Sequence, residues 1–133
     1  MSTILLSANS ACRCGSGDTY GVCCGLWHAG LRAGRFAPTP EALMRARYCA
    51  YVLNLEDYLL ATWHSSTAPK GVDFGTTQWQ SLTVHLSETD GHSGRVEFVA
   101  AYKDNGRFKR LHELSHFVFE GGRWFYVHGD ILA

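Results

Sequence analysis

Residues 96–102 read VEFVAAY, and their side chains point alternately to opposite sides of an extended chain. A period of two, with apolar residues on one side, is typical of a β-strand that packs one face against a core. The same period continues through three other segments, at residues 82–86, 111–119 and 124–127. The sequence therefore predicts four strands in its C-terminal part.

Turn signals separate these strands from one another. Asp90-Gly91, Asn105-Gly106 and Gly121-Gly122 are dipeptides that favour tight hairpins. Strands that follow one another through such turns pair in antiparallel fashion. We expect one antiparallel four-stranded sheet built from sequential hairpins.

Helices are predicted before the sheet. Thr39 can cap a helix whose first residue is Pro40, and apolar residues follow at helical spacing at Leu43, Ala46, Ala50 and Leu53. Asn54, with Asp57 three residues later, indicates a second cap and a short second helix over residues 55–63. Residues 26–38 favour a short turn or helix and then a linker. The expected fold class is α+β, with two or three helices covering one face of a curved sheet.

Composition limits the classes of function. The chain has 133 residues, of which 46% are hydrophobic and 18% charged, as in a globular protein. Twelve basic residues balance twelve acidic ones, so there is no strong nucleic-acid signature. The apolar run at residues 4–6 is too short for a signal peptide, and no run reaches membrane-spanning length. We expect a cytoplasmic protein.

A dense group of cysteines occupies residues 12–25, CRCGSGDTYGVCCG. In a reducing compartment such a cluster favours metal over disulfides, although unliganded thiols or redox partners are the alternative. Zinc accepts four thiolates tetrahedrally and would stabilise a segment without a core of its own. The predicted ligands of one structural zinc ion are Cys12, Cys14, Cys23 and Cys24.

Three further points qualify this metal site. Four cysteines close the coordination shell, so His28 would have to compete as a ligand, and no catalytic position stays open. Cys49 is far from the other cysteines in the sequence. The spacing does not separate zinc from iron. A boundary near Pro38 would divide the chain into an autonomous zinc knuckle with its linker, residues 1–37, and an α+β domain, residues 38–133.

Residues 112–116 read HELSH, which matches the zinc-protease pattern H-E-x-x-H. That mechanism needs a helix, yet the segment continues directly into predicted strand and hairpin residues. On a strand, residues four apart lie roughly 13 Å from each other at about 3.3 Å per residue. Two nitrogens bound to one zinc ion lie no more than roughly 4 Å apart. We therefore reject the protease interpretation.

The cysteine segment resembles the SEC-C zinc motif, through Cys12-x-Cys14-Gly15-Ser16-Gly17 and Cys23-Cys24-Gly25. The rest of the chain is similar to YchJ-like bacterial proteins of uncharacterised function. The similar stretches are residues 43–51 (LMRARYCAY), Tyr58-Leu59, residues 62–64 (TWH), Trp79, residues 82–84 (LTV), residues 122–127 (GRWFYV) and Gly129-Asp130. The resemblance implies a nuclear-transport-factor-two-like domain, in which a curved sheet and helices form a cone. It also places Glu113 and Ser115 in the shared pattern.

Two functions follow as hypotheses. SEC-C modules in related proteins serve as docking elements, so the preferred hypothesis is an adaptor that presents its knuckle to a protein or ribosomal partner. Cone folds also enclose pockets, and the alternative is a small-molecule binder or acid–base enzyme. Polar residues that could face such a pocket are Arg47, Tyr48, His64, His85, Glu97 and Glu113. On balance the sequence favours a protein that is not an enzyme.

Overall fold

The computed structural model describes residues 7–132, so the short apolar run at residues 4–6 lies outside it. The elements are the 3-10 helices η1 (Tyr20–Val22) and η2 (Leu31–Ala33), helices α1 (Cys24–Gly30), α2 (Pro40–Leu53) and α3 (Glu56–Ala61), and strands β1 (Gln78–Asp90), β2 (Ser93–Asp104), β3 (Arg107–Glu120) and β4 (Arg123–Ile131). Among the described residues, no helix has the length and hydropathy needed to cross a membrane. The predicted α+β class is confirmed.

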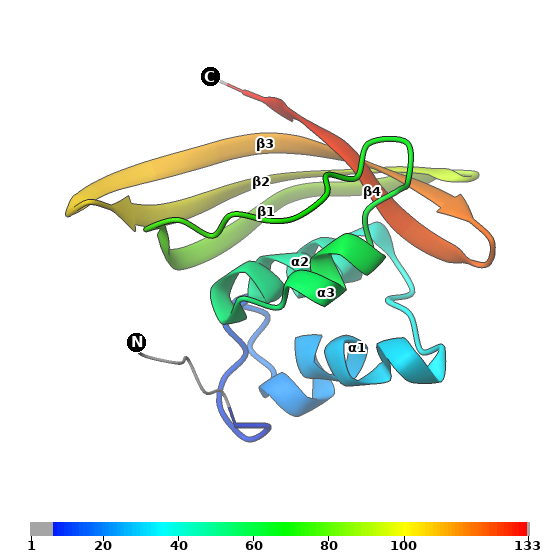
Figure 1. Cartoon of the computed structure of the whole chain (residues 1–133), viewed down its shortest axis with the longest axis horizontal. Helices are drawn as coiled ribbons and strands as arrows, with labels where there is room; N and C mark the ends of the chain where they lie inside the picture. The colour runs from blue at the N-terminus through cyan, green and yellow to red at the C-terminus, as the bar shows by residue number, and fades with distance from the viewer. Residues whose placement is uncertain (1–6, 133) are drawn as a thin grey trace.

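The four strands form one antiparallel sheet in the order β1-β2-β3-β4, as the hairpin signals predict. The second and third turns fall at their predicted dipeptides, whereas the first lies one residue later, at Gly91-His92, because Asp90 still pairs with Ser93. In the β2–β3 hairpin both turn residues are left-handed, with φ of 50° at Asn105 and 80° at Gly106. Such turns match the twist of the strands they join. Register shifts after Val84 in β1 and opposite His116 in β4 accompany the bend of the sheet seen in Figure 1.

Helix α2 begins as the sequence predicts. The Thr39 Oγ1 accepts a hydrogen bond from the Ala42 N–H at 3.0 Å, and Pro40 takes the first turn. Its end differs from the prediction, because Asn54 is left-handed (φ 59°) and caps the C-terminus of α2. Helix α3 starts after Leu55 without a side-chain cap. The assignment of Asn54 as an N-cap is therefore wrong, since its local geometry closes the first helix instead.

The molecule has three layers, with α2 at its centre (Figure 1). One side of α2 packs on the sheet, α3 lies beside α2, and α1 and the cysteine segment lie on the other side of α2. A single cluster of buried residues joins Cys12, Cys14 and Cys24 to α2 and to the strands. The buried thiols of the predicted knuckle thus belong to the core of the whole molecule, whereas the boundary near Pro38 stays a prediction.

Candidate functional site

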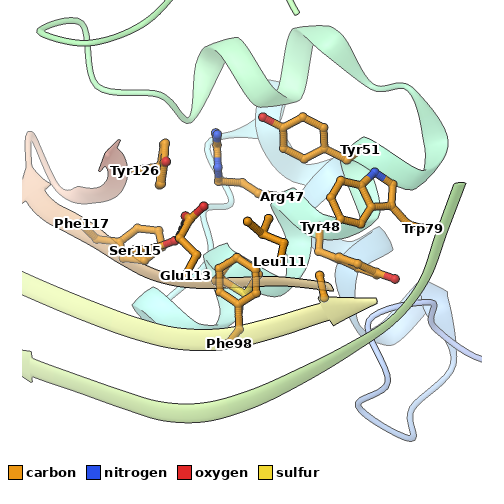
Figure 2. A pocket seen from close by; sticks show the side chains of 12 residues that line it. Arg47, Tyr48, Tyr51, Trp79, Phe98, Leu111, Glu113, Ser115, Phe117 and Tyr126 are labelled. Atoms are coloured by element: carbon orange, nitrogen blue, oxygen red, sulfur yellow. Dashed lines mark hydrogen bonds between the residues drawn. The ribbon is translucent and has the colours of Figure 1, made fainter. Parts of the chain in front are cut away.

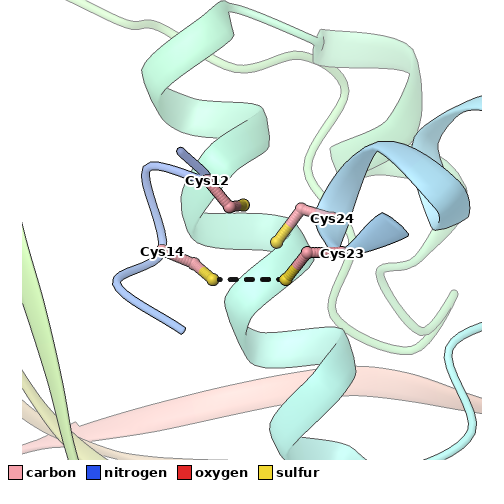
Figure 3. Close-up of side chains that lie close together, drawn as sticks. All are labelled: Cys12, Cys14, Cys23 and Cys24. Carbon is pink, nitrogen blue, oxygen red and sulfur yellow. Dashed lines mark hydrogen bonds between the residues drawn. The ribbon is translucent and has the colours of Figure 1, made fainter. Parts of the chain in front are cut away.

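The four predicted cysteine ligands lie together beside α2 (Figure 3). All four sulfur atoms lie within 4.8 Å of one another, and the Sγ atoms of Cys14 and Cys23 are 3.6 Å apart. Sulfurs bound tetrahedrally at about 2.3 Å from one zinc ion are about 3.8 Å apart. The arrangement of thiols therefore fits a four-coordinate metal ion.

The local sequence positions these thiols. Cys12 and Cys14 lie on an extended turn, and Cys24 is the first residue of α1, so the two pairs face each other. The Ser16 Oγ lies 3.1 Å from the Cys23 Sγ, and the Arg45 Nη1 donates to the Cys14 carbonyl at 2.8 Å. Hydrogen bonds of this kind hold metal ligands in place.

Crowding of the sulfurs changes their acidity in opposite directions. Hydrogen bonds from Cys12, Cys24 and Cys49 lower the pKa of Cys14. Hydrogen bonds with Cys12, Cys14 and Cys49 raise the pKa of Cys24. Thiols packed this closely therefore compete for protons. A divalent cation would allow all the ligands to be thiolates at once.

Cys49, which is remote in sequence, lies next to this cluster. It projects from α2, is fully buried, and has its Sγ 3.6 Å from the Cys12 Sγ. The sequence did not predict this contact, because Cys49 is far from Cys12 along the chain. His28 is engaged elsewhere: its Nδ1 lies 2.6 Å from the Tyr20 hydroxyl and its Nε2 2.8 Å from the Ala46 carbonyl. With both ring nitrogens bonded, His28 does not compete for a metal.

A second feature is a cavity of about 250 Å³ between α2 and the concave face of the sheet (Figure 2). Most of its wall is apolar or aromatic. The lining residues are Met44, Arg47, Tyr48, Tyr51, Trp79, Phe98, Ala100, Leu111, Glu113, Ser115, Phe117 and Tyr126. Tyr51 and Trp79 also border a neighbouring groove formed with residues 73–75 and 77–80.

Arg47 supplies the positive group of the cavity. Its Nη1 donates to the Leu59 carbonyl and to the Thr62 Oγ1, each at 2.8 Å. The guanidinium carbon lies 4.8 Å from the Trp63 ring centroid and 4.4 Å from that of Tyr126. Burial lowers the pKa of Arg47 below its ordinary value. Because a guanidinium has five N–H donors, two bonds from Nη1 leave the donors of Nε and Nη2 for other partners.

Glu113 supplies the negative group, and its carboxylate faces Arg47 in Figure 2. Its Oε2 accepts a hydrogen bond from the Ser115 Oγ at 2.5 Å. Burial is the largest effect on this carboxyl and raises the pKa of Glu113. The backbone of β4 leaves room for it, since a Cβ at Gly129 would overlap the Glu113 carboxylate. Among the described residues, Arg47 forms no direct ion pair with Glu113 or Glu97.

The structure brings three of the six predicted pocket residues to this cavity: Arg47, Tyr48 and Glu113. Burial raises the pKa of the Tyr48 phenol to about 12. The other three lie outside the cavity. His64 bonds to Ser66 and Glu120 at the end of α3, and Glu97 bonds to His112 on the outer face of the sheet. His85 is an exposed residue of β1 beside His112.

Three polar cavity residues were not among those predicted from the sequence: Tyr51, Ser115 and Tyr126. The spacing of residues could have predicted that two of them face the cavity. Tyr51 follows Arg47 by four residues on a helix, and Ser115 follows Glu113 by two on a strand, so each pair shares a face. Tyr126 arrives through the pairing of β4 with β3, which no local pattern reveals.

The H-E-x-x-H segment lies in the middle of β3, as predicted, and not on a helix. His112 and His116 project from the outer face, whereas Glu113 projects into the cavity. His112 has its Nε2 2.7 Å from a Glu97 oxygen, and His116 has its Nε2 2.8 Å from an Asp130 oxygen. The two histidines therefore have separate partners.

Comparison with known families supports the resemblance seen in the sequence. The family model described as "YchJ, middle NTF2-like domain" matches residues 39–129. A UPF0225 protein of Bordetella parapertussis is 47% identical over 128 residues, which cover 94% of this chain and 96% of the relative. A UPF0225 protein of Chromobacterium violaceum is 48% identical over 129 residues, covering 92% and 93%.

Two solved structures of SEC-C motif containing proteins share the fold. The solution structure of one from Rhodopseudomonas palustris has a TM-score of 0.81 at 35% identity and covers 92% of this chain and 98% of the other. The crystal structure of one from Psychrobacter arcticus has a TM-score of 0.78 at 25% identity, with 95% and 85% covered. The likeness extends over both the cysteine segment and the sheet.

Proposed function

The chain belongs to the YchJ-like family with a middle NTF2-like domain, and we propose that it is a metal-stabilised protein that binds a small molecule in its cavity. The observation that carries this proposal is the placement of two groups of opposite charge, the buried Arg47 and the half-buried Glu113, on the wall of a mostly apolar cavity. Pockets that bind small molecules combine apolar walls with a few placed polar groups.

The cavity limits the size and chemistry of its ligand. A buried cavity of about 150 Å³ accepts benzene, and this one measures about 250 Å³. A single ring with a short polar substituent therefore fits. Arg47 offers N–H donors and the Glu113 carboxylate offers acceptors, so the best substituent both accepts and donates hydrogen bonds. A neutral carboxamide on an aromatic ring has these properties.

Benzamide is the corresponding minimal probe, and toluene is its control without polar groups. We expect benzamide to shift the NMR signals of the Arg47 and Glu113 side chains with at least roughly tenfold higher affinity than toluene, because hydrogen bonds to charged groups contribute about 1.5–3 kcal/mol. Equal affinities, or shifts confined to residues outside the cavity, would contradict the proposal.

The cavity supports small-molecule binding more directly than catalysis by a histidine–carboxylate pair. General acid–base work on small molecules most often uses a histidine paired with a carboxylate. Within residues 7–132, the wall of the cavity contains Glu113 but no histidine. We therefore propose the small-molecule binder of the alternative hypothesis.

We propose that the metal is zinc and that it is structural. The four sulfurs match the zinc–thiolate geometry, and a closed shell leaves no position for water or substrate. Elemental analysis of the purified protein should give one zinc per chain. Changing Cys14→Ser should remove it, whereas the matched change Cys49→Ser should retain it; retention in the first variant or loss in the second would refute this ligand set.

Docking to a protein or ribosomal partner remains a second proposal. It is favoured by Val22, which is 68% exposed on the cysteine segment, and by the exposed Arg32 and Arg35 that follow. If the knuckle docks on ribosomes, Val22→Asp should abolish co-sedimentation with them. Ile131→Asp is the matched control, because Ile131 is an exposed apolar residue of β4, 70% accessible and remote from the knuckle in the fold.

A further inference from the structure

The outer face of the sheet, away from the helices, carries a row of histidines. His85 of β1, His112 and His116 of β3 and His128 of β4 project there. His116 and His128 are directly opposite each other in the β3–β4 pairing. Asp130 lies two residues beyond His128, so both project from the same face of β4. Three side chains with metal-binding atoms thus converge on one hairpin.

Their geometry is close to that of a coordination site. The His116 Nε2 lies 2.8 Å from the Asp130 Oδ2, and the His128 Nδ1 lies 3.8 Å from the Asp130 Oδ1. The two imidazole rings stack at 4.5 Å between centroids. One ligand atom from each residue falls within 4.8 Å of the other two. Ligands at about 2.0–2.2 Å from one ion lie roughly 3–3.5 Å apart, so small side-chain rotations would complete the site.

We propose that His116, His128 and Asp130 bind a second transition-metal ion, of the zinc, nickel or copper class. Two imidazoles and one carboxylate are the ligand types that these ions accept. The pairing of β3 with β4 places His116 opposite His128 before the ion binds. Water completes the coordination shell, because His128 and Asp130 are each more than half exposed.

This site is separate from the cysteine cluster in place and in chemistry. The cysteines pack beside α2 with the helices, whereas the triad lies on the opposite face of the sheet. The cysteine site offers four sulfurs, three of them on buried residues, and the triad offers nitrogen and oxygen atoms at the surface. The His112–His116 pair of the H-E-x-x-H pattern is not involved, because His116 takes its partners from β4.

The test is a titration of the zinc-loaded full chain with zinc chloride, followed by mass spectrometry and by the NMR signals of the histidine rings. One additional ion per chain should bind and shift the His116 and His128 rings. His128→Ala and Asp130→Ala should each weaken its binding at least roughly tenfold. His85→Ala, on the same face, should leave binding unchanged.

Folding is checked by the amide NMR spectrum, which these surface substitutions should leave intact away from β3 and β4. His128→Gln provides a second variant that keeps the size and polarity of the side chain but lacks the imidazole. Absence of a second ion, or a second ion that survives both His128→Ala and His128→Gln, would overturn the assignment.

Discussion

Arg47 is a cation held in the core by two oxygen acceptors and two aromatic faces. Removing a charge from water is costly unless its hydrogen bonds are remade, and here the Leu59 carbonyl and the Thr62 hydroxyl remake two of them. The remaining donors have the cavity beside them. The residue thus braces α2 against α3 and gives the cavity its positive group.

Replacing Arg47 with lysine keeps the charge but removes the planar guanidinium group and its several N–H donors. We expect Arg47→Lys to destabilise the fold by about 1–3 kcal/mol and to weaken benzamide binding at least roughly tenfold. Urea unfolding and NMR titration measure the two effects. Arg110→Lys, an exposed change on β3, is the control and should alter neither. Full benzamide affinity in Arg47→Lys would show that the guanidinium makes no ligand contact.

Glu113 makes stability depend on pH. Because burial raises its pKa in the fold, folded and unfolded chains both hold the proton at low pH, and the unfolded chain ionises first as pH rises. This carboxyl therefore reduces stability above its ordinary pKa. Glu113→Gln should be more stable than the parent at pH 7 by a larger margin than at pH 4. Urea unfolding at each pH measures the difference in free energy of unfolding between the variant and the parent. A difference that is equal at both pH values, or larger at pH 4, would exclude this explanation.

Single residues show what sequence can and cannot predict about the cavity. Arg47, Tyr48 and Glu113 could be predicted because helix and strand periodicity assigns them to inner faces. The same alternation places His85 and Glu97 on the face opposite Val84 and Phe98, so the sequence could have excluded both from the cavity. Cys49 could not be predicted, because its contact with Cys12 depends on the packing of α2.

Among the elements, helix α2 is buried on two opposite sides, so residues on both sides must fit their neighbours. Polar and aromatic residues line the cavity on one side, and Cys49 meets the cysteine cluster on the other. A helix that is apolar nearly all round is typical of a central position. The turn dipeptides and the cap at Thr39 could be predicted because their chemistry is local. The end of α2 at Asn54 could not, since the same residue type suits either kind of cap.

Strand β4 passes close to the Glu113 carboxylate at Gly129, where the absence of a side chain leaves room for it. Gly129→Ala would insert a methyl group into that carboxylate and should destabilise the fold by about 1–3 kcal/mol. The cost should shrink to less than about 0.5 kcal/mol in a Glu113→Ala background, where the overlapping atoms are absent. Urea unfolding of the two single variants and the double variant measures this coupling. Additive costs would show that Gly129 matters for another reason.

At the scale of the whole molecule, one core joins the cysteine segment to the sheet. The metal should therefore stabilise the entire fold and not only the knuckle. Removing it with a chelator, or by Cys12→Ser with Cys14→Ser, should destabilise the protein by more than about 3 kcal/mol. The indole NMR signal of Trp124, which is buried in the sheet, should then report the same unfolding transition as circular dichroism of the helices.

Separate transitions would contradict this account of one shared core. In that case the sheet, followed through Trp124, would unfold at the same denaturant concentration with and without the metal. The cavity would also keep its affinity for benzamide after chelation. We expect instead that chelation destabilises the helices and the sheet together and also weakens benzamide binding.

The cavity as a binding site is the central claim, and a pair of neighbouring substitutions on β2 tests it most directly. Ala100 lines the cavity, whereas Ala101 projects to the other face of the same strand. The measurement is the NMR titration of benzamide into Ala100→Leu and Ala101→Leu. We predict that Ala100→Leu fills the space and loses binding while remaining folded, and that Ala101→Leu binds as the parent does. Unchanged affinity in folded Ala100→Leu would contradict the claim.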